Sequence, residues 1–506
     1  MTEARDANDS NPNIYAAIDL GSNSFHLVIA REVHGQLQII DKHKEMIRLR
    51  SGLDKKGFLT PEAFQNGIEC LERFGQLIKT IPPQQVRAVG TNTLRNAKNS
   101  HEFLSQARRA LGHSIQIIAG QEEARLIYLG VAHGLPQNDE QRLVMDIGGG
   151  STEYIIGQNF SYNHLTSTEM GCVSITQSFF PKDDISEKRM NKAISACRQI
   201  LRPHLVKLTR LGWDCAFGAS GTIKAIGTIL KENDWSQSGI TLDGLHRLKD
   251  AMIQVDAVQN ADIAGLKEER VPVLPGGLAI LIATFEELKI EQMQVSSNAL
   301  REGLIFDTLG RLFAEDVRET SVAAIQTWLK IDLPQANATA RTAEMLYRQA
   351  HNSWQLHDSE YNYDKLLNWA ARLHEGGMAL SYKRYRHHSA YLIENAELAG
   401  FTQEEKQMLA AMLLNHRGKF VPEAYAVFDE PHNEKLQYLT VLLRLAVRLH
   451  RGRETDIPDI LLYLEGDKSI RLQFENDWLP AHPLTQMDLD IEAERLAAAG
   501  FTLSYQ

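Results

Sequence analysis

The stretch IYAAIDLGSNSFHLVIA at residues 14–30 returns in altered form as LVMDIGGGSTEYIIG at residues 143–157. In each copy an apolar strand ends at an aspartate, Asp19 or Asp146, and a turn of glycine and hydroxyl residues leads into the next apolar strand. Glycine-rich turns let backbone N–H groups converge on an anion, and the aspartate can hold Mg²⁺ beside it. One such turn is typical of an ordinary β-hairpin. Two copies in one chain predict two phosphate loops that face each other.

The length and charge of the chain restrict its class. A chain of 506 residues is long enough for three or four domains. Its net charge of −10 repels polyanions, so a phosphate-rich ligand has to be held locally. No helix-turn-helix, zinc-finger or RNA-binding aromatic signature is present, so we expect no specific nucleic-acid partner.

The cysteines and the N-terminus predict a cytoplasmic protein. The four cysteines lie far apart without a CxxC pair, which favours neither a zinc site nor a disulfide framework. Residues 1–13 are polar and predict a flexible tail. No apolar run approaches the length that spans a bilayer, so we expect no integral membrane segment. Peripheral association with a membrane stays open.

The pattern of strands and helices predicts an α/β fold with further domains behind it. The two loops open the halves of a degenerate internal repeat, with one α/β domain at residues 14–135 and a second at residues 136–313. Residues 314–455 carry almost continuous helical periodicity, which predicts a helical domain. Residues 456–506 predict a small α+β C-terminal module made of a hairpin, a helix and a final strand.

Six motifs in order carry a resemblance to a known family. They are DLGSNSFH (19–26), GTNTLR (90–95), GQEEARLIY (120–128), DIGGGSTE (146–153), GASGTIKA (218–225) and ALREG (299–303). With them the chain resembles the exopolyphosphatase / guanosine pentaphosphate phosphohydrolase family of the actin-like superfamily, and looks most similar to bacterial exopolyphosphatases. The resemblance implies two actin-like (ribonuclease H-like) domains, a homodimer and hydrolysis of a terminal phosphoanhydride.

The resemblance also implies the residues of the site. Glu123 matches the general base that activates water. Without the resemblance, it is a carboxylate favoured near a helix N-terminus. Its neighbour Glu122 lies about 100° away around the helix and should point elsewhere. The metal positions for Mg²⁺ fall on Asp146, Glu153 and Asp19. The phosphate-binding positions are Asp19, Gly21, Ser22, Asn23, Ser24, Arg95, Gly148, Gly149, Gly150, Ser151, Thr152 and Gly221.

Two of these positions have a plain alternative. Arg95 can be a solvated surface arginine instead of a phosphate clamp. The GASGTIKA stretch resembles the place where actin-like enzymes cradle adenosine, but its glycines can equally serve close strand-to-helix packing. Ser297 and Asn298 precede ALREG where relatives often have glycine. This difference disfavours a bound adenine nucleotide, and a closed pocket there would fit a phosphatase better than a kinase.

The helical region carries histidines and basic residues with open roles. It resembles the HD phosphohydrolase superfamily, and His374, Glu375, His387 and His416 form either a metal site or part of a metal-free scaffold. A basic set is either a solvated face or a channel for polyphosphate whose binding weakens with salt. That set is Lys383, Arg384, Arg386, His387, His388, Arg417 and Lys419.

The leading prediction is a Mg²⁺-dependent exopolyphosphatase that releases orthophosphate from inorganic polyphosphate. The alternative is the 5′-phosphohydrolase that converts guanosine-5′-triphosphate,3′-diphosphate (pppGpp) to ppGpp, or both activities together. GGGSTE and HHSAY lean toward polyphosphate by resemblance. A non-catalytic polyphosphate or alarmone sensor and an ATP-dependent kinase or chaperone are more remote.

Overall fold

The computed structural model forms two compact units, Met1–Glu315 and Asp316–Gln506, and each is described by itself. The tail predicted at residues 1–13 lies outside the described residues except for Asn13. The structure describes residues 13–33, 36–136, 138–181, 184–254, 263–312, 316–358, 361–396, 398–453, 457–475 and 478–506.

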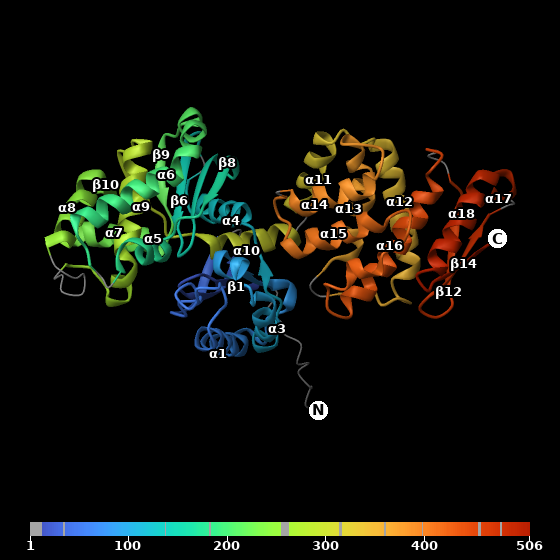
Figure 1. Ribbon diagram of the computed structural model, residues 1–506, viewed down its shortest axis with the longest axis horizontal. Helices are drawn as coiled ribbons and strands as arrows, with labels where there is room; N and C mark the ends of the chain where they lie inside the picture. The colour runs from blue at the N-terminus through green and yellow to red at the C-terminus, as the bar shows by residue number, and fades with distance from the viewer. Residues whose placement is uncertain are drawn as a thin grey trace, which may run out of the picture. The chain divides into compact units, whose positions relative to one another are not determined.

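The first unit contains two sheets that share one topology. In Figure 1 the first sheet is found at β1 and the second at β6, β8 and β9. The strand order is β3-β2-β1-β4-β5 in one sheet and β8-β7-β6-β9-β11-β10 in the other, so the predicted internal repeat is confirmed. In each sheet an antiparallel hairpin is followed by parallel strands. The strands are β1 Ile14–Leu20, β2 Phe25–Val33, β3 Gln36–Glu45, β4 Val86–Gly90, β5 Gln116–Ile117, β6 Gln141–Ile147, β7 Thr152–Gln158, β8 Ser161–Thr168, β9 Cys215–Gly218, β10 Ile240–Thr241 and β11 Gln292–Val295.

The register puts the two loops at equivalent places. Leu20 pairs with Phe25 and Ile147 with Thr152, so each hairpin closes with four loop residues, 21–24 and 148–151. Asp19 lies opposite His26, and Asp146 lies opposite Glu153. Both aspartates therefore stand two residues before the first residue of their loop, near the corresponding end of their strands.

Helices cover the two sheets, and their ends carry ordinary capping signals. α1 begins after Thr60, whose hydroxyl accepts from Ala63 N–H, with Pro61 in the first turn. α3 ends at Gly112 in the left-handed region, φ 75°. The helices of this unit are α1 Pro61–Ile78, α2 Asn92–Asn96, α3 Ser100–Leu111, α4 Gly120–His133, α5 Cys172–Phe179, α6 Glu187–Leu211, α7 Gly221–Glu232, α8 Leu242–Gln254, α9 Leu274–Leu288 and α10 Leu300–Leu312.

α4 and α10 run side by side at very short range (Figure 1). A Cβ added at Gly303 would lie 1.8 Å from the carbonyl oxygen of Leu126, and one at Gly130 would lie 2.1 Å from that of Ala299. Only glycine allows backbones to approach this closely. The contact fixes the start of α4, which carries Glu123, relative to the start of α10, which carries Arg301.

One segment of the described chain, Glu268–Leu288, is long and apolar enough to cross a membrane, which the sequence analysis did not expect. It comprises a short 3₁₀ helix, Glu268–Val273, and α9. In the structure 78% of its apolar window is buried, and Leu278, Ile280 and Phe285 belong to the core of the second α/β domain. The segment is therefore placed as a core helix.

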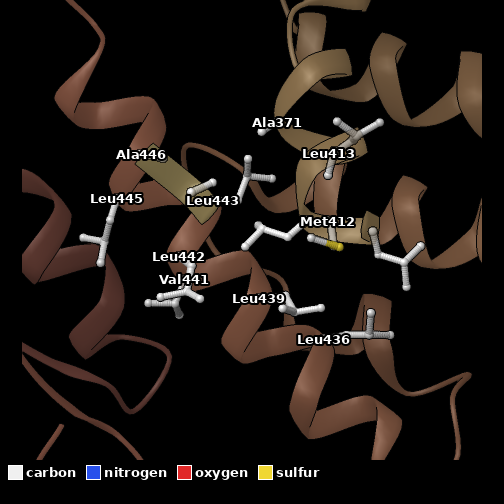
Figure 2. Close-up of a cluster of buried hydrophobic side chains, with 14 of the residues drawn as sticks. Ala371, Met412, Leu413, Leu436, Leu439, Val441, Leu442, Leu443, Leu445 and Ala446 are labelled. Atoms are coloured by element: carbon white, nitrogen blue, oxygen red, sulfur yellow. The ribbon is translucent and has the colours of Figure 1, made fainter. Parts of the chain in front are cut away.

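The second unit is mostly helical, and its core is centred on α16. Figure 2 shows leucines of α16, among them Leu439 and Leu443, gathered with Met412 of α15 and Ala371 of α13. The helices are α11 Val317–Trp328, α12 Leu333–Ala350, α13 Tyr363–Leu373, α14 Tyr385–Asn395, α15 Gln403–Asn415, α16 His432–Leu449, α17 Trp478–Ala481 and α18 Pro483–Ala497.

A three-stranded sheet completes the second unit. β12 Ile460–Leu464 pairs antiparallel with β13 Ser469–Phe474, and β14 Thr502–Tyr505 pairs parallel with β13. Apolar residues of these strands, including Leu472 and Leu503, belong to the same core as the helices. The helical region and the small module thus share one core.

Candidate active site

The two predicted loops line one cavity of about 390 Å³ in the first unit. A Cβ added at Gly149 would lie 2.9 Å from Cβ of Ser22, so the loops meet face to face. Most of the predicted site residues line this cavity: Asp19, Gly21, Ser22, Asn23, Ser24, Glu123, Asp146, Gly148, Gly149, Gly150, Ser151 and Gly221.

Backbone hydrogen bonds hold both loops in place. The carbonyls of Gly148 and Gly149 accept from the N–H groups of Cys172 and Val173 at 2.9 and 3.0 Å, at the start of α5. In the first loop the carbonyl of Ser22 accepts from Arg50 N–H at 2.9 Å. These hydrogen bonds connect the second loop to the start of α5 and the first loop to the segment around Arg50.

Three carboxyl groups line the cavity and a fourth, that of Glu153, interacts with them through its charge, and the pKa of each is raised. Burial, followed by the charge of Asp19, raises the pKa of Asp146 to about 7. Burial raises the pKa of Asp19 to about 6 against the charge of Arg301. Burial and then Asp146 raise the pKa of Glu153 to about 8, and burial and then Glu153 raise that of Glu123 well above its usual value. The group repels itself when ionised, so it favours a bound cation or protons.

Three of these carboxyl groups keep an unused buried oxygen. Asp19 Oδ1, Glu123 Oε2 and Glu153 Oε2 have no hydrogen-bond partner in the described part of the chain. Mg²⁺ binds in proteins through one or two carboxylates and completes its shell with water and substrate phosphate oxygens. The described residues offer no ready-made group of three or more His, Cys, Asp or Glu ligands. The donor set fits a Mg²⁺ that arrives with its phosphate ligand.

Asp146→Asn is expected to stabilise the protein at pH 8 in EDTA by about 1–2 kcal/mol, after allowance for solvent screening. The pKa of Asp146 is raised to about 7 in the folded protein, against ~4 when unfolded. Its carboxyl therefore destabilises the fold progressively as the pH rises from about 4 to about 7, and the penalty stays constant above pH 7 and vanishes below about pH 4. Thermal denaturation at pH 4, 6 and 8 measures the gain. A gain that is equal at all three pH values would contradict this assignment.

Glu123 stands in the first turn of α4 beside Arg95. The nearest atoms, Arg95 Nη1 and Glu123 Oε2, are 3.9 Å apart, and the same Nη1 donates to the carbonyl of Ile118 at 2.6 Å. Arg95 thus touches the predicted base but is not among the residues that line the cavity. Glu153 lies behind the cavity wall and accepts from Ser167 Oγ at 2.8 Å.

The structure does not bring Thr152 to the cavity. Its side chain is buried, and its hydroxyl donates to the carbonyl of Met170 at 2.6 Å. The predicted phosphate contact of Thr152 is therefore corrected to a structural hydrogen bond, because a strand residue one position past the loop points into the sheet's own packing.

Glu122 points away from Glu123, as its position around the helix predicted. Its two carboxylate oxygens accept from Arg125 Nε and Nη2 at 2.8 Å each. Arg125 also donates to Asp307 of α10 at 2.5 Å, and Asp307 accepts from Arg87 and Arg311 at 2.6 and 2.8 Å. This buried ion network, in which Arg87, Arg125 and Arg311 share Asp307 and Arg125 also holds Glu122, connects the start of α4 to β4 and α10.

The cavity is also lined by five basic side chains that were not predicted as site residues. Local spacing could not group them because they come from β3, the segment before α9, α7 and α10. Arg301 and Lys224 do stand inside the ALREG and GASGTIKA motifs, which was an available signal. The five are Lys42, Lys44, Lys224, Arg270 and Arg301.

A second cavity of about 610 Å³ lies beside the first, and Lys224 lines both. Its wall includes Thr228 of α7 and Ser297. Lys224 Nζ donates to the carbonyl of Ser297 at 2.8 Å. The space beside α7 and Ser297 is therefore an open cavity rather than a closed pocket.

In the basic set of the helical unit, some side chains are held by hydrogen bonds within the protein and others are exposed to solvent. Arg386 Nη1 donates to three backbone carbonyls, those of Leu414, Arg417 and Lys419, at 2.9 Å each. Arg417 stacks on the ring of Tyr385 at 4.9 Å and donates to its hydroxyl. Arg386 and Arg417 are therefore structural. Lys383, Arg384, His387 and Lys419 are exposed, and His388 is half-buried.

The histidines of the helical unit do not assemble the metal site that was one alternative. His374 and His416 are buried with ring centroids 5.5 Å apart. The Nδ1 of each lies 2.7 or 2.6 Å from a backbone carbonyl oxygen. His387 is exposed. No cluster of three potential ligands occurs among the residues that the structure describes.

Family models match two adjoining stretches of the chain. The Ppx/GppA phosphatase family matches residues 28–312, and Ppx/GppA phosphatase, domain III matches residues 317–493. The chain belongs to the Ppx/GppA phosphatase family. The resemblance inferred from the six motifs is thus confirmed, and so is the prediction of an enzyme that hydrolyses phosphoric anhydrides.

Relatives in the Ppx/GppA family are similar over nearly the full length. A Vibrio cholerae protein named guanosine-5′-triphosphate,3′-diphosphate pyrophosphatase is 40% identical over 499 residues, 97% of this chain and 98% of its own. An Aliivibrio fischeri protein of the same name is 39% identical over 494 residues, again 97% and 98%. These names correspond to the alternative activity rather than to the leading prediction.

Solved structures share the fold of somewhat more than half of this chain. The Aquifex aeolicus PPX-GPPA enzyme is 27% identical with a TM-score of 0.50, covering 58% of this chain and 98% of its own. An exopolyphosphatase from Cytophaga hutchinsonii is 24% identical with a TM-score of 0.54, covering 59% and 98%, and bears on the fold alone. The predicted mixed α/β, actin-like architecture is confirmed at this level.

Proposed function

We propose that the protein is a pppGpp 5′-phosphohydrolase, which cleaves the terminal phosphoanhydride of the 5′-triphosphate and yields ppGpp and orthophosphate. The observation that carries this proposal is the 40% identity over 97% of the chain to a relative with that substrate in its name. This identity supports hydrolysis of pppGpp better than it supports hydrolysis of polyphosphate.

The two adjoining cavities support a substrate with a nucleoside. The 390 Å³ cavity between the loops suits a phosphate chain, and the 610 Å³ cavity beyond Lys224 offers room for a base and ribose. Thr228, Gln237 and Gln294 line the second cavity with hydrogen-bonding groups. A linear polyphosphate has no part that needs this space.

In the proposed reaction Glu123 takes a proton from a water molecule. The water oxygen attacks the terminal phosphorus in line with the bridging oxygen, the bond to that oxygen breaks, and the leaving diphosphate end carries the electron pair. The two loops hold the phosphate chain, and Lys42, Lys44, Lys224, Arg270 and Arg301 offset its negative charge. Arg95 orients the Glu123 carboxylate. Mg²⁺ held by Asp19 and Asp146, with Glu153 behind, would neutralise phosphate charge when bound.

The decisive experiment compares phosphate release from pppGpp and from long-chain polyphosphate by one purified preparation in Mg²⁺ buffer. We expect a higher kcat/KM for pppGpp. A preference for polyphosphate would restore the exopolyphosphatase reading, and release from neither would favour the sensor.

Thr228→Phe is expected to lower kcat/KM for pppGpp about tenfold while leaving that for polyphosphate unchanged. Thr228 is exposed on α7 at the wall of the second cavity, so the larger ring fills the cavity without disturbing the core. Steady-state phosphate release with both substrates measures the effect, with Thr209→Phe on the exposed face of α6 as a matched control. Equal losses on both substrates would place the nucleoside elsewhere.

An additional exopolyphosphatase activity is the second candidate. It is favoured by the exposed basic residues Lys383, Arg384 and Lys419 of the helical unit, which suit a long polyanion. We also infer that this unit is an HD-like scaffold and that the protein works as a homodimer. Polyphosphate binding through this surface should weaken steeply between 50 and 300 mM salt, which a filter-binding assay measures.

A further inference from the structure

His26 lies between a hydroxyl of the first loop and a guanidinium from α10. Its Nε2 is 2.7 Å from Ser24 Oγ, and its Nδ1 is 2.5 Å from Arg301 Nη1. All three side chains line the cavity between the two loops. His26 is on β2 and Arg301 follows 275 residues later, so the chain of contacts joins two distant parts of the unit.

The chemistry of these groups fixes the direction of each hydrogen bond. A guanidinium has donors only, so Arg301 donates and His26 Nδ1 accepts. A neutral imidazole then carries its one proton on Nε2, which donates to Ser24 Oγ. Burial, followed by the charges of Arg301, Lys44, Arg270 and Lys224, lowers the pKa of His26 well below its usual value, in keeping with a neutral ring.

This direction determines what Ser24 can do. Because Ser24 Oγ already accepts from His26, its remaining hydrogen-bonding capacity includes its own O–H, which is free to donate into the cavity. Without this hydrogen bond from His26, the hydroxyl could rotate and turn either its oxygen or its proton toward the cavity. Arg301 Nε is itself buried without a hydrogen-bond partner among the described residues, which leaves this N–H for a ligand as well.

We propose that His26 is a positioning residue of this site: locked in one tautomer by Arg301, it presents the Ser24 hydroxyl as a hydrogen-bond donor to the phosphate chain of the substrate. The proposal rests on the proposed function only in taking the cavity between the loops as the phosphate site. It assigns His26 no proton transfer. The relay consists of the two hydrogen bonds that run from Arg301 through His26 to Ser24, and it acts on any substrate with that phosphate chain.

The test is a mutant cycle read by binding as well as by turnover. Ser24→Ala and His26→Leu are each expected to weaken tripolyphosphate binding, measured by calorimetry, about tenfold. The double variant should be no weaker than the worse single variant, because both changes act through the one hydrogen bond that Ser24 donates to phosphate. Losses that multiply in the double variant would overturn the relay.

A conservative variant separates positioning from plain packing. Glutamine at position 26 offers an acceptor oxygen to Arg301 and a donor N–H to Ser24, so His26→Gln should bind tripolyphosphate within about threefold of the wild type. If His26→Leu fails to fold, this variant decides. A folded His26→Gln protein that loses as much affinity as Ser24→Ala would overturn the proposal.

Substrate turnover keeps this test apart from that of the proposed function. The wild-type rates on pppGpp and polyphosphate examine the proposed function, whereas the ratio of variant to wild type examines the relay. We expect the same rise in KM on both substrates with kcat changed less, since the hydroxyl contacts the shared phosphate chain. Tripolyphosphate affinities give an answer even if neither substrate is turned over.

Discussion

Glu123→Gln is expected to slow phosphate release from pppGpp by about 10² to 10⁴-fold at saturating substrate. Glutamine keeps the size of the side chain in the first turn of α4 but cannot accept the proton of the attacking water. Removing one charge from the self-repelling group of Asp19, Glu123, Asp146 and Glu153 should leave pppGpp binding unchanged or tighter. Single-turnover phosphate release and calorimetry measure the two effects.

The wild type supplies a second readout of the same assignment. The pKa of Glu123 is raised well above its usual value, chiefly by burial and then by Glu153. Its base form is therefore lost as the pH falls through a region above the ordinary carboxyl range, and kcat/KM should fall with it.

A matched control for Glu123→Gln is Glu62→Gln, which changes an exposed carboxylate in the first turn of α1. Wild-type turnover by Glu123→Gln would remove Glu123 from the role of base.

The loops could be predicted from sequence because their information is local. A strand, an aspartate, four turn residues and a returning strand form one hairpin, and the same order appears twice. Turn chemistry and the alternation of apolar residues depend on near neighbours only. The repeat in turn predicted that the two loops face each other, and in the structure Ser22 of the first loop lies against Gly149 of the second.

The basic part of the cavity could not be predicted in this way. Arg301 stands inside the ALREG motif, but α10 reaches the cavity by packing against α4 and β1, and the spacing of residues along the sequence does not indicate that Lys42 lines the same cavity. The same limit applies to Arg386 and Arg417, which sequence patterns present as free charges. Only the structure reveals that backbone carbonyls and the Tyr385 ring already occupy their guanidinium groups.

Asp307→Ala is expected to destabilise the first unit by about 3–5 kcal/mol. Asp307 is buried and accepts hydrogen bonds from three arginines, Arg87, Arg125 and Arg311. Although burial alone would raise the pKa of Asp307, these charges hold it well below its usual range. Removing the carboxylate leaves buried cations without their partner, and a small alanine cannot replace it. Urea titration of the full chain at pH 7 measures the loss.

An exposed ion pair provides the control for this prediction. Asp243 and Arg247 form an i,i+4 pair on α8 with Nε and Oδ2 2.9 Å apart, and Asp243→Ala should change stability by less than about 1 kcal/mol. Asp307→Ala should also slow phosphate release, because the network holds the turn of α4 that presents Glu123. If Asp307→Ala were as stable as Asp243→Ala, the start of α4 would depend on the close packing at Gly130 and Gly303 instead of on these charges.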